Sequence, residues 1–159
     1  MIKNFNTVAF LFVWEELADH FDIRRLDIKA MFGCHAIYLD SKIICILRKR
    51  DDPKNIRDNG LWMVLSGDHF DSLKKEFKSL RPIELFQDYT KKGFSTWFNL
   101  PEDELDFEES AFEFCNLIKR NDPRLGKLPK SRLSSSAKNS KKKPPLKKTL
   151  KKSSKKKSK

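Results

Sequence analysis

The sequence is poor in glycine, with five glycines among 159 residues. A phosphate-binding loop built from backbone N–H groups requires several glycines at fixed spacing, and no such pattern is present. The sequence therefore argues against a protein that holds a nucleotide in a glycine-rich loop. We expect no cofactor.

Cysteine is also scarce. The three cysteines, Cys34, Cys45 and Cys115, are odd in number and widely spaced, so they indicate neither a disulfide framework nor a pair with metal-ligand spacing. This usage fits a reducing compartment, so we expect a cytoplasmic protein, with association with the nucleoid left open. The apolar stretch at 6–14 is shorter than the roughly 20 residues of a membrane span and lacks a signal-peptide cleavage pattern. We expect no attachment to a membrane.

The C-terminal part of the chain lacks both acidic and aromatic residues. Residues 127–159 contain 14 lysines and Arg132 but no Asp or Glu, which gives a charge of +15. Residues 1–126 have a charge of −3, and no aromatic residue follows Phe114. Only the first part can bury enough apolar surface to offset the entropy lost on folding. We therefore expect a folded domain at 1–130 and a disordered, Lys/Ser/Pro-rich tail at 131–159.

Apolar residues recur at helical spacing in three segments of the first part. The first helix is expected within 7–20, with Thr7 as N-cap, and the second begins at Ser66 or Asp68 and ends before Pro82. The third is the clearest, because acidic residues fill its first turns and basic residues its last, as the helix dipole favours. The residues expected on the three buried faces are Val8, Phe12, Leu17 and Phe21; Phe70, Leu73, Phe77 and Leu80; and Phe107, Ala111, Phe114, Cys115 and Ile118.

Five short β-prone runs lie between these helices. They are HAIYL (35–39), KIICILRK (42–49), LWMVL (61–65), PIELF (82–86) and FSTWF (94–98). The two residues Asp40-Ser41 between the first two runs predict a tight hairpin, residues 51–60 predict a loop, and 91–93 predict a turn. Strands that follow one another without a helix between each pair favour an antiparallel sheet. The expected fold is therefore α+β: a five-stranded antiparallel sheet packed with helices in two layers, in the order α-β-β-β-α-β-β-α.

Several stretches of the sequence together resemble one known family. They are MFG (31–33), AIYLD (36–40) followed by Lys42, WMVL (62–65), Trp97 with LPEDE (100–104), and FEESAFEFC (107–115) with Ile118 and NDPRLGKLPK (121–130). This pattern resembles the N-terminal domain of TfoX/Sxy-type proteins, which include bacterial competence regulators and many small single-domain proteins. The resemblance covers roughly residues 29–130. It implies a two-layer α+β fold related to secretion-chaperone-like domains, and it implies no catalytic residues.

Cys34-His35 is the first candidate site, because a thiol beside an imidazole can be a nucleophile and its base. On an extended strand, however, neighbouring side chains point to opposite faces, so the interpretation we favour is structural, with MFG forming a turn. A reactive Cys34 would need His20 or His69 from elsewhere. Trp62 and Trp97 lie in expected strands, so we expect them in the core; an aromatic pocket near them, between the sheet and the helices, is a second open alternative.

Two charged clusters have simpler interpretations. The acidic run at 102–109 can be interpreted as a metal site, but a solvated helix N-terminus explains it better, so we expect no metal. The basic residues at 48–50, with Lys54 and Arg57, are interpreted as a solvated loop that Asp51, Asp52 and Asp58 partly neutralise.

The tail has no competing anions. Its lysines can neutralise phosphates and release counterions without reading sequence. We therefore expect a non-enzymatic adaptor or regulator, whose folded domain binds an unknown protein and whose tail binds nucleic acid. The alternatives are a protein-interaction domain with a solubilising tail, and a small enzyme that uses Cys34 or the aromatic pocket. The expected nucleic-acid-binding residues are Lys141, Lys142, Lys143, Lys147, Lys148, Lys151, Lys152, Lys155, Lys156, Lys157 and Lys159.

Overall fold

The computed structural model describes residues 5–87 and 95–129. The chain divides into a unit of Met1–Pro129 and a second unit of Lys130–Lys159, and all described residues belong to the first. The disordered tail expected at 131–159 therefore lies outside the described residues, as does the turn expected at 91–93.

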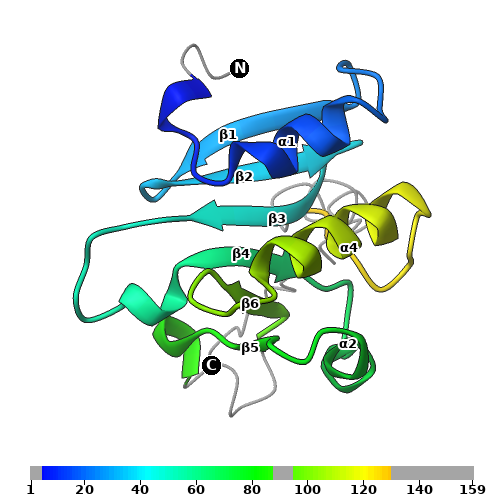
Figure 1. Cartoon of the computed structure of the whole chain (residues 1–159). Coiled ribbons are helices and arrows are strands. Elements are labelled where there is room, and N and C mark those ends of the chain that lie inside the picture. The colour runs from blue at the N-terminus through cyan, green and yellow to red at the C-terminus, as the bar shows by residue number, and fades with distance from the viewer. Residues whose placement is uncertain (1–4, 88–94, 130–159) are drawn as a thin grey trace, which may run out of the picture. The chain divides into compact units, whose positions relative to one another are not determined.

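The described residues form an α+β domain (Figure 1). Helices and strands follow in the order α1 (Leu11–Ala18), β1 (Leu26–Met31), β2 (Cys34–Leu39), β3 (Lys42–Arg48), β4 (Gly60–Val64), α2 (Phe70–Glu76), β5 (Arg81–Pro82), β6 (Trp97–Pro101) and α4 (Phe107–Lys119). Three short 3-10 helices accompany them: η1 (Phe5–Thr7), η2 (Ile56–Asp58) and η3 (Glu84–Phe86).

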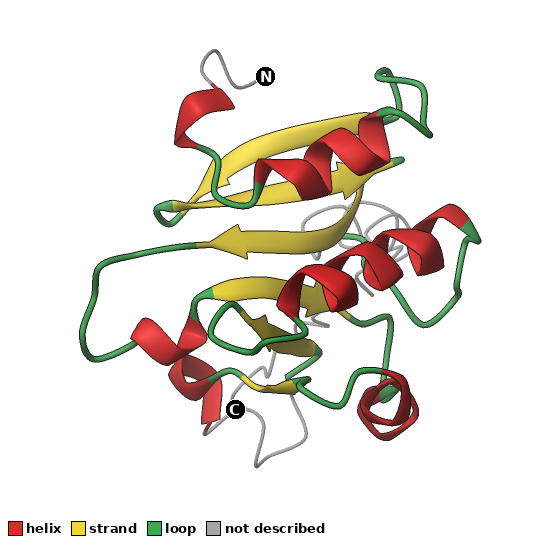
Figure 2. Ribbon diagram, in the orientation of Figure 1, coloured by secondary structure: helices red, strands yellow, loops and turns green. Residues whose placement is uncertain are grey.

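The strands form an antiparallel sheet in the order β1-β2-β3-β4-β6-β5 (Figure 2). The α+β class and the antiparallel arrangement are confirmed. The expected count of five strands is wrong, because the described residues contain six. The additional strand is β1, whose sequence LDIKAM mixes charged and apolar residues without the long β-branched run that marks β3.

Two-residue turns connect the first three strands. Phe32 and Gly33 join β1 to β2 with φ angles of 51° and 76°, and Asp40 and Ser41 join β2 to β3 with 49° and 68°. Positive φ at both central residues is the turn geometry that matches the right-handed twist of paired strands. The hairpin expected at Asp40-Ser41 and the turn expected at MFG are confirmed. Arg25 donates to both carboxylate oxygens of Asp40 and supports the second turn.

Helices α1 and α4 lie side by side on one face of the sheet (Figure 1). The buried face of α4 is the one that the spacing predicts, and it packs with α1 and the sheet in the main hydrophobic core. A second, smaller core lies on the opposite face of the sheet. It consists of Cys34, Ala36, Ile43, Ile46, Trp62, Val64 and Ile83.

The expected helix boundaries need correction. Phe10, with φ of 52°, occupies the N-cap position of α1, so Thr7 is not the cap. His69 occupies that position in α2 and makes no side-chain cap bond, while the Ser66 hydroxyl donates to the Pro123 carbonyl instead. Helix α2 ends at Glu76, although Phe77 and Leu80 beyond it are buried as expected.

The last two strands also differ from the expectation. Only Arg81–Pro82 is a strand in the segment 81–86, because Glu84–Phe86 turns into η3. The strand expected at 94–98 lies instead at Trp97–Pro101. Tertiary contacts override local preference here, because η3 is fixed by a carboxylate from a distant loop, as described below.

Replacing Phe114 by alanine tests the packing of α4. The Phe114 side chain is fully buried, so Phe114→Ala should lower the free energy of unfolding by about 3–5 kcal/mol. Glu109→Ala, on the exposed side of the same helix, should change it by less than about 0.5 kcal/mol. Urea denaturation of both variants measures the difference, and equal losses would contradict this assignment of the buried face.

Candidate functional site

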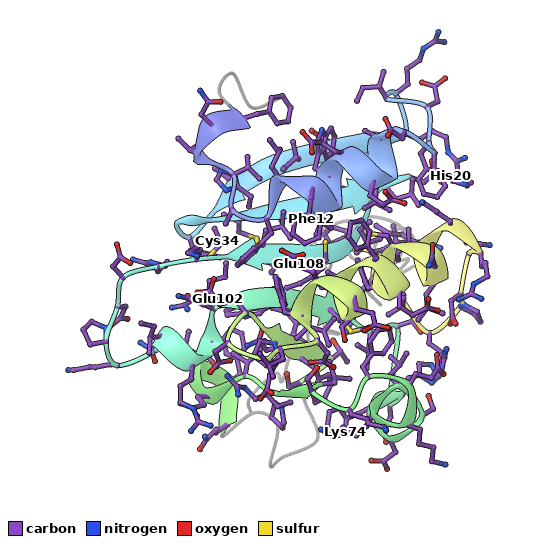
Figure 3. The ribbon with its side chains drawn as sticks, in the orientation of Figure 1. Phe12, His20, Cys34, Lys74, Glu102 and Glu108 are labelled. Carbon is purple, nitrogen blue, oxygen red and sulfur yellow. The ribbon has the colours of Figure 1, made fainter. Side chains whose placement is uncertain are left out.

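Cys34 and His35 lie on opposite faces of β2. Cys34 and Ala36 belong to the second core, and Cys34 is 6% exposed, whereas Ile37 belongs to the main core on the face of α1 and α4, which is the face of His35. Neither remaining histidine completes a catalytic pair. Cys34 and His20 lie at opposite ends of the sheet (Figure 3), and His69 precedes α2, on the other face. The structure therefore does not bring a base to the Cys34 thiol.

The environment of Cys34 disfavours its thiolate. Burial raises the pKa of the Cys34 thiol, and the nearby charges of Arg48 and Arg50 oppose this shift without cancelling it. Burial also raises the pKa of Cys115 to about 12 and that of Cys45 well above its ordinary value. All three cysteines are free and buried. A thiolate is the nucleophilic form, so these thiols have the character of packed core residues.

The accessibility of the thiols can be measured by alkylation. Because burial raises the pKa of all three, they should react with iodoacetamide at pH 8 more slowly in the native protein than in urea. The alkylation rate of the native protein should still be increasing above pH 9, because the thiols ionise only at higher pH. Mass spectrometry locates the modified residue. If Cys34 of the native protein reacted faster than the unfolded chain, the enzyme hypothesis would gain its required nucleophile.

Trp62 and Trp97 come together in the second core. They lie on the sheet face opposite α1 and α4, with Phe86 of η3 beside them. The ring centroids are 6.5 Å apart for the two tryptophans, 5.7 Å for Trp62 and Phe86, and 5.9 Å for Phe86 and Trp97. The rings pack on one another and complete the second core. The expected placement of both tryptophans in the core therefore agrees with the structure, and they do not line a pocket on the side of the sheet that α1 and α4 cover.

The carboxylate of Asp58 holds η3 against this cluster. Asp58 is 1% exposed, and its two oxygens accept hydrogen bonds from the backbone N–H groups of Glu84 (2.7 Å) and Leu85 (3.0 Å). Its carbonyl oxygen accepts from the Trp62 indole N–H at 2.7 Å. One residue therefore anchors both the start of η3 and the central aromatic ring. Asp58 does not neutralise a solvated basic loop, as its position in the sequence had suggested.

Arg48 is a second buried charged residue of this region, at 2% exposed. Its guanidinium donates to the Asn55 carbonyl at 2.9 Å and to the Asn59 side-chain oxygen at 2.6 Å, and lies 5.8 Å from the Trp62 ring centroid. Asn59 also exchanges hydrogen bonds with the backbone of Arg50. Arg48 therefore ties the loop 49–59 to the sheet and is not available as part of an exposed basic patch.

The rest of the expected basic patch is largely paired. Lys49 forms an ion pair with Glu102, and Arg57 forms one with Glu84. Arg50 donates to the Phe32 carbonyl in the β1–β2 turn. The interpretation as a solvated loop is wrong for the buried Arg48. A hydrogen bond from the Asn55 side chain lowers the pKa of the nearby Asp52 carboxyl, and the charges of Arg48 and Arg50 help to lower it. The ion partners of Lys49 and Arg57, however, come from distant segments. Sequence proximity could not reveal these partners.

An acidic groove of about 780 Å³ lies between α2 and α4. Glu108, which lies on α4 (Figure 3), and Glu109 line it, together with three further carboxylates and Lys78. Two of these carboxylates are already paired, because Glu76 binds Arg124 and Glu113 binds Arg120. In the part of the chain that the structure describes, no group of three or more His, Cys, Asp or Glu side chains is arranged to hold a metal ion.

The lysines that carry the nucleic-acid hypothesis, from Lys141 to Lys159, lie outside the described residues. Among the described helices, none is both long and apolar enough to cross a membrane. No family model, curated protein or solved structure matches the chain. The resemblance to TfoX/Sxy-type and secretion-chaperone-like domains thus depends on the residues quoted above and stays a prediction.

The polar cluster of Arg48, Asp58, Asn59 and Asn99 was not predicted from the sequence. A signal was present, because Asn59-Gly60 lies at the start of β4 and Asn99 interrupts the apolar run of β6. Gly60 is required there: a Cβ atom at this position would lie 2.0 Å from the Leu100 carbonyl oxygen. The Asn99 amide donates to the carbonyls of Arg57 and Asn59 across this close approach.

The role of Asp58 can be tested by substitution. Asp58→Ala removes the acceptor of two backbone N–H groups and should lower the free energy of unfolding by about 1–3 kcal/mol. Tryptophan fluorescence should change in the folded state, since η3 no longer holds Phe86 against Trp62. The matched control is Asp51→Ala, an exposed position in the same loop, which should cost less than about 0.5 kcal/mol. Equal stability of the two variants would refute this role.

Proposed function

We propose that this protein is a non-enzymatic, cytoplasmic adaptor or regulator that is tethered to nucleic acid by its lysine-rich tail. The partition of charge carries the proposal: residues 127–159 have a charge of +15 and residues 1–126 a charge of −3. The folded part carries a net negative charge and is repelled by phosphate, whereas the positively charged tail is attracted to it. The resemblance to the N-terminal domain of TfoX/Sxy-type proteins is in line with a regulatory role.

The surface of the folded domain supports assigning the nucleic acid to the tail. Many of its cations are held by carboxylates at 2.6–3.3 Å, which leaves them less free to meet phosphates. These pairs are Arg25–Asp40, Lys29–Asp27, Lys49–Glu102, Arg57–Glu84, Arg81–Asp103, Arg120–Glu113 and Arg124–Glu76. Besides Glu76 and Glu113, which are in these pairs, the groove between α2 and α4 contains three further carboxylates, Asp106, Glu108 and Glu109. A polyanion would therefore meet repulsion there.

The tail, in contrast, carries only positive charge. Eleven lysines lie between residues 141 and 159, with no acidic residue among them. Each ammonium group that meets a phosphate releases condensed counterion, and it does so without contacting base edges. Binding of this kind is strong at low salt and indifferent to sequence. It concentrates the folded domain near nucleic acid and leaves the domain surface for a protein partner.

The enzyme alternative has less support, because the Cys34 thiol is buried and, within the described residues, no histidine is positioned to accept its proton. The alternative of a tail that only keeps the protein in solution makes a different prediction, and a salt titration separates the two.

The salt dependence of duplex DNA binding tests the proposal. Because a flexible arm engages only part of its lysines at once, log K against log salt should have a slope of about −5 to −8. Unrelated duplex sequences should bind almost equally. The full-length variant in which the eleven lysines at 141–159 are changed to glutamine should lose most of this affinity. A control that changes Lys74, Lys75 and Lys78 of the folded domain to glutamine should retain it.

Two results would overturn the proposal. Equal affinity of the native chain and the tail variant would place the binding in the folded domain. A slope close to zero would mean that counterion release contributes nothing, and the tail would then be a solubility device.

A further inference from the structure

The two outer strands of the sheet differ in how they are protected. β5 is two residues long and contains Pro82, which cannot donate to a further strand. β1 is six residues long, contains no proline, and pairs with β2 without a register shift. Figure 1 shows β1 as the outermost strand beside α1. Proteins commonly protect exposed edge strands of this length, because the free backbone N–H and C=O groups can pair with a strand of another molecule.

The backbone groups on the free side of β1 can be assigned. The Asp40 N–H donates to the Arg25 carbonyl, so position 25 faces β2. Hydrogen-bonding direction alternates along an antiparallel strand, so positions 27, 29 and 31 also face β2. Leu26, Ile28 and Ala30 therefore direct their N–H and C=O groups outward. Within the described part of the chain, no strand pairs with them.

We propose that two copies of this chain associate through their β1 strands, antiparallel, with Ile28 opposite the partner's Ile28. In this register Leu26 lies opposite the partner's Ala30, so all three outward-facing residues find hydrogen-bonding partners. The two-fold axis is perpendicular to the sheet. The two sheets then continue into one, with both α1 helices on the same face.

Charge selects this register. Asp27 and Lys29 lie on the same face of β1, where they already form an ion pair at 2.9 Å. With Ile28 opposite its copy, Asp27 lies opposite the partner's Lys29 and Lys29 opposite the partner's Asp27, so four alternating charges form a square. These are the closely spaced, non-hydrogen-bonded pairs of an antiparallel ladder, in which side chains interact most directly.

The neighbouring registers are unfavourable. A slip by one residue would oppose outward-facing and inward-facing backbone groups. A slip by two residues in one direction places Asp27 opposite the partner's Asp27, and in the other direction it places Lys29 opposite the partner's Lys29. Like charges directly opposite each other destabilise a strand pair. Among the registers within two residues of it, the proposed register alone satisfies both the backbone and the charges.

Exposed apolar side chains at the two ends of β1 also support association with a second copy of the chain. Ile23, three residues before the strand, is 57% exposed, and Phe32, directly after it, is 88% exposed. Antiparallel pairing brings the Ile23 end of one copy to the Phe32 end of the other. A mainly apolar hollow of about 180 Å³ also lies along the edge, lined by Phe5, Trp14, Ile23, Leu26, Asp27 and Ile28. A second copy would cover it.

Cysteine cross-linking in the full chain tests the register. Asp27→Cys and Lys29→Cys are made separately, and the native cysteines are buried. When the two variants are mixed and oxidised, we expect a disulfide-linked heterodimer, because Cα atoms in such pairs lie about 4.5 Å apart, within disulfide range. Neither variant alone should cross-link. Self-cross-linking of either variant, or no cross-linking of the mixture, would overturn the proposal.

Sedimentation equilibrium of charge variants gives an independent test. Asp27→Lys should weaken self-association at least about tenfold, because it places a lysine at position 27 opposite the partner's Lys29. The double variant Asp27→Lys with Lys29→Asp should restore it, since the alternation of charge returns. Both side chains are about half exposed, so the fold should tolerate the changes. A native chain that stays monomeric at 200 μM, or a double variant as weak as the single one, would refute the interface.

Discussion

The fold depends on the burial of β3 and β4 on both of their faces. Six of the seven residues of β3 and all five of β4 are buried. An antiparallel sheet commonly leaves one face to water, but these central strands require cover on two sides. Helices α1 and α4 cover one side. On the other side, η3 brings Phe86 onto Trp62 and Trp97, so a short irregular segment serves as part of a core.

This arrangement places polar backbone groups in an apolar setting, and a small polar cluster satisfies them. The Asp58 carboxylate accepts hydrogen bonds from the first two backbone N–H groups of η3. Arg48 and Asn59 fix the loop between β3 and β4. The same cluster removes residues of chemical interest from the surface. Arg48 is buried, and Cys34 is packed nearby with its thiol pKa raised. The region that looked most reactive in the sequence is therefore structural.

Local patterns predicted the elements that depend on local physics. The spacing of Phe107, Ala111 and Phe114 predicted α4, and Asp40-Ser41 predicted its hairpin, because periodicity and turn chemistry act over a few residues. The strand β1 and the short helix η3 were missed, because β1 is fixed by pairing with β2, and η3 by a carboxylate 26 residues away. The ion partners of the loop 49–59 were missed for the same reason. The candidate lysines of the tail came from composition alone.

The central proposal is that nucleic acid binds to the lysine-rich tail and not to the folded domain. The most direct measurement is an amide NMR titration of the full chain with a short duplex DNA at low salt. If the proposal is correct, chemical-shift changes should be confined to residues after 130, and the amides of β1–β6, α1 and α4 should be unchanged. Shifts concentrated on the folded domain, with the tail unaffected, would contradict it.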